Sequence, residues 1–191
     1  SDIDEDALTL SVTDNDSVTI DIVNFDITFG SAQDWNGTEI VTFTVNDDQG
    51  RLVATDEVDI IVTPVNDSPV LDSIGAQSTS EDTSLTILLS AEDVDDIDLV
   101  FSVSSNNNAV TVSIDEDQLT MTPALNYNGD SDITVTVSDG FLIDEETFVL
   151  TVTPVNDPPT ISLPESFTFA EDNSLLVDFS GYISDIDEDA L

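Results

Sequence analysis

A short phrase occurs twice in the chain, as Thr63–Pro69 (TPVNDSP) and Thr153–Pro159 (TPVNDPP), 90 residues apart. Each copy follows a run in which apolar residues alternate with polar ones, so each ends a strand and begins a proline-stiffened connector. Self-similarity at such a period indicates an array of units rather than one large fold. Units of this length are typical of small β-sandwiches.

The composition limits the partners that such an array can have. The 191 residues include 42 Asp and Glu against a single basic residue, Arg51, which gives a formal net charge of -41. This charge repels nucleic acid and anionic membranes and attracts cations. No stretch approaches the roughly 18 apolar residues of a membrane-spanning helix, so we expect no membrane insertion in this segment.

Residues 1–66 show the period-two alternation of half-buried strands, with turn clusters such as Asn36-Gly37 between them. Residues 67–157 repeat this order and place two further strands in front of it. Seven short strands in about 90 residues predict an antiparallel Greek-key sandwich, so the fold class is all-β. We therefore expect a partial repeat over residues 1–66, which lacks its two leading strands, and a complete repeat over residues 67–157.

Residues 158–191 give the leading strands of a third repeat, with apolar positions at Leu175, Val177 and Phe179. The last eight residues, Ser184–Leu191, are identical to Ser1–Leu8. Two explanations follow: a window cut from one continuous array, or subunits that polymerise head to tail by donating strands. A window longer than its period must duplicate its ends, so we expect a continuous array with a 183-residue double repeat.

Acidic residues recur at the ends of the predicted strands. A Glu-Asp pair precedes the second strand, a D-x-D motif follows it, an Asp follows the sixth strand, and an Asn-Asp pair lies in the connector. In extended backbone the two carboxylates of D-x-D lie about 6.6 Å apart on one side of the chain. Calcium takes six to eight oxygen ligands, which converging loops can supply. The chain has no His and no Cys, so calcium is the cofactor that this chemistry favours.

With these motifs in this order, the chain resembles the cadherin-like tandem repeats of large bacterial and archaeal surface proteins. The matching features are the Pro-Val-Asn-Asp-x-Pro connector, the Glu of the Glu-Asp pair, the D-x-D motif and the Asp before Gly140. The resemblance covers all 191 residues. It implies calcium ions between successive sandwiches, where they stiffen the array.

The resemblance assigns ligands to two junctions. Around the second connector these are Glu81, Asn156, Asp157, Asp185 and Asp187. Around the first connector they are Asn66, Asp67, Asp93, Asp95 and Asp139. The equivalent positions in the partial repeats are Glu171, Asp2, Asp4 and Asp47.

The chain also departs from the family pattern. Pro64 and Pro154 stand where cadherins have an Asp in the connector, and where cadherins have an acid-bearing turn before the sixth strand this chain has Asp34-Trp35-Asn36-Gly37 and Asn126-Tyr127-Asn128-Gly129. These differences imply fewer ions per junction than in animal cadherins, or a shifted site. For the two aromatic residues we expect a corner-packing role rather than a sugar-stacking platform.

We therefore expect a calcium-stiffened extender of a cell-surface adhesin or extracellular filament. Its partners would be calcium ions, neighbouring repeats of the same chain, other copies in a filament or cell-surface ligands. One alternative is a module that binds glycans or proteins through its loops, and another is that the acids only solvate the surface. Catalysis is not expected, because the chain lacks His and Cys and its carboxylate pairs recur in every unit.

Overall fold

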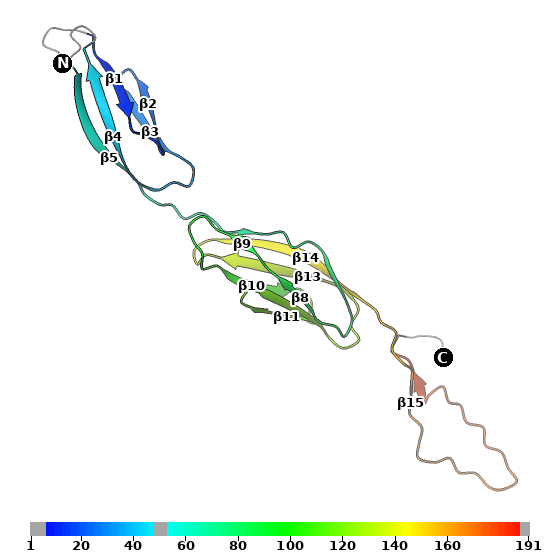
Figure 1. Ribbon diagram of the computed structural model, residues 1–191. Helices are drawn as coiled ribbons and strands as arrows, with labels where there is room; N and C mark the ends of the chain where they lie inside the picture. The colour runs from blue at the N-terminus through cyan, green and yellow to red at the C-terminus, as the bar shows by residue number, and fades with distance from the viewer. Residues whose placement is uncertain (1–6, 48–52, 188–191) are drawn as a thin grey trace. The chain divides into compact units, whose positions relative to one another are not determined.

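The computed structural model describes residues 7–47 and 53–187, and every regular element in these ranges is a β-strand (Figure 1). This confirms the all-β prediction. The chain divides into two compact units, Ser1–Asp67 (unit 1) and Ser68–Leu191 (unit 2). Asp2 and Asp4 lie outside the described residues. None of the described residues forms a helix that could cross a membrane.

Unit 1 contains a three-stranded antiparallel sheet and a separate hairpin. The sheet has the order β1-β4-β5, with β1 at Thr9–Thr13, β4 at Gly37–Asn46 and β5 at Val53–Val62. The hairpin joins β2 (Val18–Val23) to β3 (Asp26–Ser31). The strands predicted from the alternation of apolar and polar residues are therefore present in unit 1.

Only part of the apolar face of unit 1 is buried. Val18 and Val41 are fully buried, and the rings of Phe29 and Phe43 pack edge to face with centroids 6.4 Å apart. Yet Phe29 is 46% exposed and Val58 is 43% exposed, although both belong to strands. Unit 1 thus has strands and a small core, with apolar side chains left in contact with solvent.

The centre of unit 2 is a two-layered sandwich, which we call the central repeat (residues 68–157). One sheet has the order β10-β13-β14-β7 and the other has the order β11-β12-β8. The strands are β7 (Gln77–Ser80), β8 (Leu85–Leu88), β10 (Val100–Ser105), β11 (Val110–Asp115), β12 (Gln118–Pro123), β13 (Gly129–Ser138) and β14 (Ile143–Thr153).

One strand pair of the central repeat is parallel, which is a local departure from the predicted antiparallel sandwich. β7 runs parallel to β14, with Gln77 opposite Leu150. β14 fixes the approach to this strand through two carboxylates. Asp144 accepts a hydrogen bond from the Leu71 N–H at 2.9 Å, and Glu146 accepts one from the Ile74 N–H at 2.9 Å. The chain is thereby held along β14 before β7 begins.

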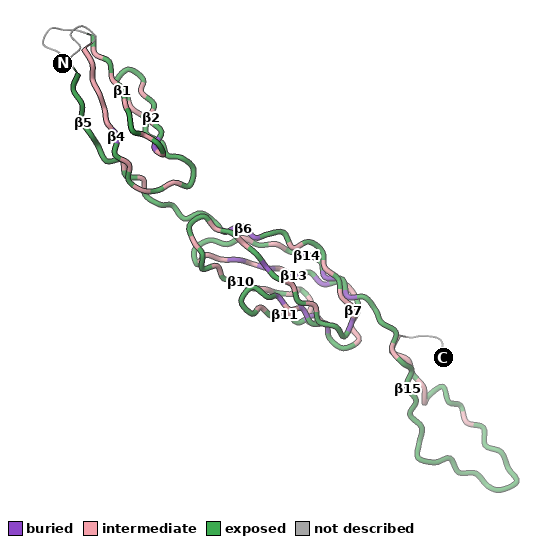
Figure 2. The backbone as a smooth tube through the Cα atoms, in the orientation of Figure 1, coloured by how far each residue is buried: buried purple, intermediate pink, exposed green. Residues whose placement is uncertain are grey.

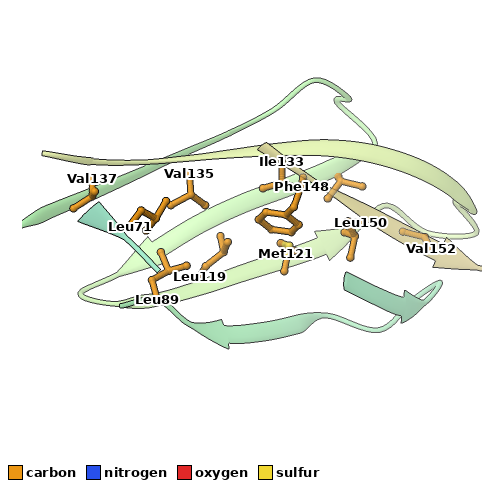
Figure 3. Packing of buried hydrophobic residues seen from close by; sticks show 11 residues of the cluster. Leu71, Leu89, Leu119, Met121, Ile133, Val135, Val137, Phe148, Leu150 and Val152 are labelled. Atoms are coloured by element: carbon orange, nitrogen blue, oxygen red, sulfur yellow. The ribbon is translucent and has the colours of Figure 1, made fainter. Parts of the chain in front are cut away.

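The core of the central repeat is formed by the inward positions of both sheets (Figure 3). Burying a large aliphatic side chain contributes about 1.5–3 kcal/mol. Figure 2 shows the buried backbone positions concentrated in this part of unit 2. The buried residues of this cluster are Leu71, Leu89, Val110, Leu119, Met121, Ile133, Val135, Val137, Phe148, Leu150 and Val152.

A two-stranded sheet begins the central repeat and is repeated after it. β6 (Val70–Leu71) pairs with β9 (Ala91–Glu92), and β15 (Thr160–Ile161) pairs with β16 (Ile183–Ser184). In each sheet the second residue of the first strand lies opposite the first residue of the second. Residues 158–187 therefore begin with the same strand pairing as the central repeat, and their assignment to a third repeat remains a prediction.

The strand expected at Leu175, Val177 and Phe179 is absent. Residues 162–182 contain no strand. In the central repeat the equivalent strand, β8, exists through its ladder with β12. None of the described residues after Thr160 provides an equivalent of β12. A strand requires a partner for its backbone groups, so the apolar pattern alone is not sufficient here.

Candidate metal centre

The two connectors have the same local conformation. The Asn66 side-chain amide donates to the Asp67 carbonyl at 2.9 Å, and the Asn156 amide donates to the Asp157 carbonyl at 3.1 Å. The Asn-Asp pair thus closes each connector upon itself, which holds the Asp side chain at a defined point of the chain. Asn66 and Asp67 end unit 1, whereas Asn156 and Asp157 lie within unit 2.

Glu81 is brought to the second connector by β7. Its backbone N–H donates to the Thr153 carbonyl at 2.9 Å, which continues the β7–β14 ladder. Its carboxylate is buried and accepts a hydrogen bond from the Val155 N–H at 2.5 Å. Burying a carboxylate that has no basic partner among the described residues costs free energy. The hydrogen bond offsets part of this cost, and a bound cation would offset more of it.

The D-x-D motif that follows the connector also reaches it. The Asp157 N–H donates to Asp187 at 2.6 Å, and the Asp187 N–H donates to Asp185 at 2.9 Å. Three carboxylate-bearing residues are therefore linked through backbone hydrogen bonds within unit 2.

The carboxyl group of Asp157 is in an unfavourable position for a negative charge. Partial burial raises its pKa above the ordinary value of 3.8, and the charges of Asp187, Asp82, Glu81 and Asp185 raise it further. Like charges that crowd one carboxylate disfavour its ionised form. A bound cation would remove this penalty, so the donor set fits a divalent ion that prefers oxygen ligands.

Asp82 was not among the predicted ligands, yet its charge acts on Asp157. It lies in a left-handed turn with φ 59° and accepts a hydrogen bond from the Asn126 N–H at 2.8 Å. An Asp in this conformation is typical of turns. Its position beside Glu81 was a signal that could have identified it.

An open hollow of about 510 Å³ adjoins the same carboxylates. Its lining combines the carboxylates of Asp157 and Asp185 with apolar surface from Pro158 and Ile186, and it is open to solvent. It is lined by Asn126, Asp157, Pro158, Thr160, Ser184, Asp185 and Ile186.

The first D-x-D motif of unit 2 is bent and not extended, which corrects the expected geometry. Asp93 accepts hydrogen bonds from the Asp95 N–H at 2.8 Å and the Asp96 N–H at 2.9 Å, as in an Asx turn. The short Asp side chain competes with extended pairing for these N–H groups. The other oxygen, Asp93 Oδ2, is buried and has no hydrogen-bond partner within the described residues. This oxygen is therefore available to accept a hydrogen bond from water or to bind a cation.

The remaining predicted ligands are distributed over other loops. Asp139 closes the β13–β14 turn by accepting from the Phe141 and Leu142 N–H groups, both at 2.6 Å. Asp47 follows β4 in unit 1, and Glu171 lies exposed between β15 and β16. The grouping of Asn66 and Asp67 with Asp93, Asp95 and Asp139 remains a prediction, because these residues belong to two units. No three acidic side chains among the described residues form a preassembled metal site.

Tyr127 and Trp35 occupy equivalent corners of the two units. The Tyr127 hydroxyl donates to the Asp130 carbonyl at 3.1 Å and accepts from the Asn107 amide at 2.6 Å. Both rings cover a glycine, since a Cβ on Gly129 would lie 3.2 Å from the Tyr127 hydroxyl and one on Gly37 would lie 3.3 Å from Trp35. These contacts favour the corner-packing role over a sugar platform.

The family model described as a cadherin-like domain matches residues 65–153. The central repeat is cadherin-like. Domains of this family are typically extracellular and serve adhesion or structure. A search of curated proteins finds no significant match.

Several solved structures share part of the fold. EC1-2 of human protocadherin-24 has a TM-score of 0.49 and 18% identity, over 82% of this chain and 85% of that chain. EC1-2 of chicken VE-cadherin has a TM-score of 0.42 and 17% identity, over 76% and 84%. An endo-fucoidan hydrolase of glycoside hydrolase family 107 has a TM-score of 0.37 and 20% identity, and this chain spans 24% of its length. At these TM-scores the likenesses carry no argument about activity.

Proposed function

We propose that the chain is a calcium-stiffened extender of a repetitive cell-surface adhesin or extracellular filament, with calcium bound at the junctions between repeats. The observation that supports this is the position of Asp157 in the connector, where partial burial and the charges of four other carboxylates raise its pKa. A chain with one basic residue in 191 has almost no side chain that could balance this charge. A metal cation is the remaining partner of matching chemistry.

Glu81 from the central repeat, Asp157 from the connector, and Asp185 and Asp187 from the next repeat would hold the ion. Calcium supplies a positive centre that draws oxygens from both repeats to one point. The residues themselves limit the motion of the connector. Val155 is held by Glu81 and Asp157 is held by Asp187, so the connector has backbone contacts with the repeats on both sides. Pro154, Pro158 and Pro159 restrict it further.

The alternative, a glycan- or protein-binding module, predicts aromatic side chains gathered at one end of the complete repeat. Residues 68–157 contain four aromatic residues, of which Phe148 is buried and Phe101 and Tyr127 are half-buried. Phe141 is exposed without an aromatic companion on its loop. This distribution favours the extender.

Calorimetry of the full chain with calcium, and with sodium chloride at equal ionic strength, tests the proposal. Binding to the native state adds about 2.7 kcal/mol at a hundredfold excess over the dissociation constant. We expect calcium to raise the melting temperature of the central repeat beyond the effect of sodium.

Asp157→Asn is the decisive variant, because it removes the side-chain charge and keeps the backbone N–H that donates a hydrogen bond to Asp187. It should abolish the calcium-specific shift. Asp115→Asn, an exposed acid on β11, removes the same charge elsewhere and should leave the shift unchanged. Equal shifts with calcium and sodium would show that screening alone acts and would contradict the proposal.

A further inference from the structure

The two connectors differ at one position that changes the chemistry of the backbone. Ser68 follows Asp67 in the first connector, whereas Pro158 follows Asp157 in the second. Among the 7 prolines of the chain, Pro158 alone follows an Asp. The bond between Asp157 and Pro158 is therefore the single Asp-Pro peptide bond of the sequence, and it lies after β14, where Pro158 is exposed.

A proline after an Asp closes one reaction of the Asp side chain and favours another. The N–H of a following residue can attack the Asp carboxyl group and form a cyclic imide, but Pro158 has no N–H, so this route is closed. The proline nitrogen is a tertiary amide nitrogen, which takes up a proton and leaves more readily than a secondary one. The carboxylate of Asp157 can reach the main-chain carbonyl carbon of its own residue through a five-membered ring, and intramolecular attack of this kind is fast when the geometry is held.

The carbonyl group of this peptide bond accepts a hydrogen bond from the preceding side chain. The Asn156 amide donates to the Asp157 carbonyl oxygen at 3.1 Å. This oxygen is the atom that gains negative charge when the carbonyl carbon is attacked. A positioned N–H donor at such an oxygen stabilises the tetrahedral intermediate, as in an oxyanion hole. Asn156 therefore favours attack on the Asp157 carbonyl carbon.

The backbone on the amino side of the bond is also held. The Asp157 N–H donates to Asp187 at 2.6 Å, and the Val155 N–H donates to Glu81 at 2.5 Å. Less rotational freedom is then lost when the Asp157 side chain attacks. The open hollow beside the connector is lined by Asp157 and Pro158, so water reaches both sides of the bond.

We propose that the second connector is a self-cleaving site, at which the chain cuts its own bond between Asp157 and Pro158. A carboxylate oxygen of Asp157 adds to the carbonyl carbon of the same residue. The bond from that carbon to the Pro158 nitrogen breaks as the nitrogen takes a proton from a water molecule. The hydroxide that remains opens the cyclic anhydride, so one water is consumed and no other reactant is needed. This inference does not depend on calcium.

The cut separates the central repeat from the residues after it and leaves its sandwich whole, because β14 ends at Thr153. The first connector is not cut. It has the same contact from Asn66 to the Asp67 carbonyl, at 2.9 Å, but Ser68 keeps its N–H and is a poorer leaving group. The difference between Ser68 and Pro158 therefore confines cleavage to one of the two connectors.

Mass spectrometry of the full chain, incubated in mildly acidic buffer with chelator, tests the proposal. We expect the fragments Ser1–Asp157 and Pro158–Leu191, formed at a rate that does not depend on chain concentration because the reaction is intramolecular. The chain unfolded in urea at the same pH gives the intrinsic rate of an Asp-Pro bond. The folded chain should be cut about tenfold faster, which is less than the factor of about 10²–10³ for a buried donor, because Asn156 is exposed.

Asn156→Ala should lower the rate in the folded chain to that of the unfolded chain. Asn108→Ala, the matched control, removes the same amide from an exposed turn and should leave the rate unchanged. Pro158→Ala should abolish the cut, and Ser68→Pro should add a second cut after Asp67. An unchanged melting transition of the central repeat shows that each variant still folds. A folded chain that is cut no faster than the unfolded one, or equal rates in Asn156→Ala and Asn108→Ala, would overturn the proposal.

Discussion

Unit 1 and the central repeat contain the same long hairpin in the same register, yet they differ in what the hairpin buries. β4–β5 places Gly37 opposite Val62, and β13–β14 places Gly129 opposite Val152. In the central repeat Phe148 is 4% exposed, whereas Val58, its equivalent in unit 1, is 43% exposed. The strands are alike and the cores are not.

The difference lies in the two leading strands. In the central repeat β7 extends one sheet beside β14 and β8 extends the other beside β12. Together they cover the inward side chains of both sheets from one side. Hairpin pairing therefore forms the strands of unit 1, but burial of its apolar face requires elements that pair with its free edges.

Core truncation should separate the two regions most strongly. Leu150→Ala removes a fully buried side chain and should cost the central repeat about 2–5 kcal/mol in free energy of unfolding. Ile60→Ala, the equivalent change in unit 1, should cost clearly less, because Ile60 is only half-buried and lines an open groove between β3 and β5.

Denaturant titration of the full chain can follow both regions. Fluorescence of Trp35, the single tryptophan, reports unit 1, and hydrogen exchange in β13 peptides reports the central repeat. Equal costs for the two substitutions would mean that the core of unit 1 is as complete as that of the central repeat.

Backbone strain should affect both regions alike. Gly37 and Gly129 have φ values of 147° and 136°, and an added Cβ would meet Trp35 or Tyr127 closely. Gly37→Ala and Gly129→Ala should each cost about 1–3 kcal/mol, as is usual for residues in sparsely populated conformations. The same titration measures both, and Gly75→Ala serves as a control for strain without a close neighbour, since nothing lies within 4 Å of its Cβ position. A large cost in one unit alone would show that the two corners are not equivalent.

The smallest expected effect is a pH dependence of opposite sign in the two regions. In unit 1 the N–H groups of Asp16 and Val18 donate to Glu39 and lower its pKa below 4.5. Glu39 therefore stabilises unit 1 above the unfolded pKa, and this contribution is lost as the pH falls through the lowered value. Because the pKa of Asp157 is raised above 3.8, its contribution is present below that pH and is lost as the pH rises through the raised value.

Glu39→Gln should flatten the acid loss of stability in unit 1, and Asp157→Asn should remove the loss that accompanies rising pH in the central repeat without calcium. Thermal melts between about pH 3 and 6 in the presence of chelator measure both, because this range brackets the ordinary carboxyl pKa values. Parallel pH profiles in the two regions would contradict the assigned environments of these carboxylates.

The sequence alone determined the all-β class and nearly all of the strands, because period-two alternation and turn residues are local properties. It also predicted Glu81, Asp157, Asp185 and Asp187 as calcium ligands, because acids at strand ends recur with the repeat, and their role as ligands remains a prediction. Asp157 and Asp187 lie 30 positions apart along the chain, and Glu81 lies further away still. Hydrogen bonds and charge nevertheless link these residues and Asp185 at one connector.

Tertiary structure alone decided three other features. The parallel β7–β14 pair depends on carboxylates of β14 that hold residues 71–74 from 73 positions away. The role of Asp82 depends on the Asn126 N–H, which lies 44 positions away along the chain. The apolar pattern at Leu175, Val177 and Phe179 gives no strand, because a strand is stabilised by the neighbour that pairs with it, and that neighbour is not encoded in the segment itself.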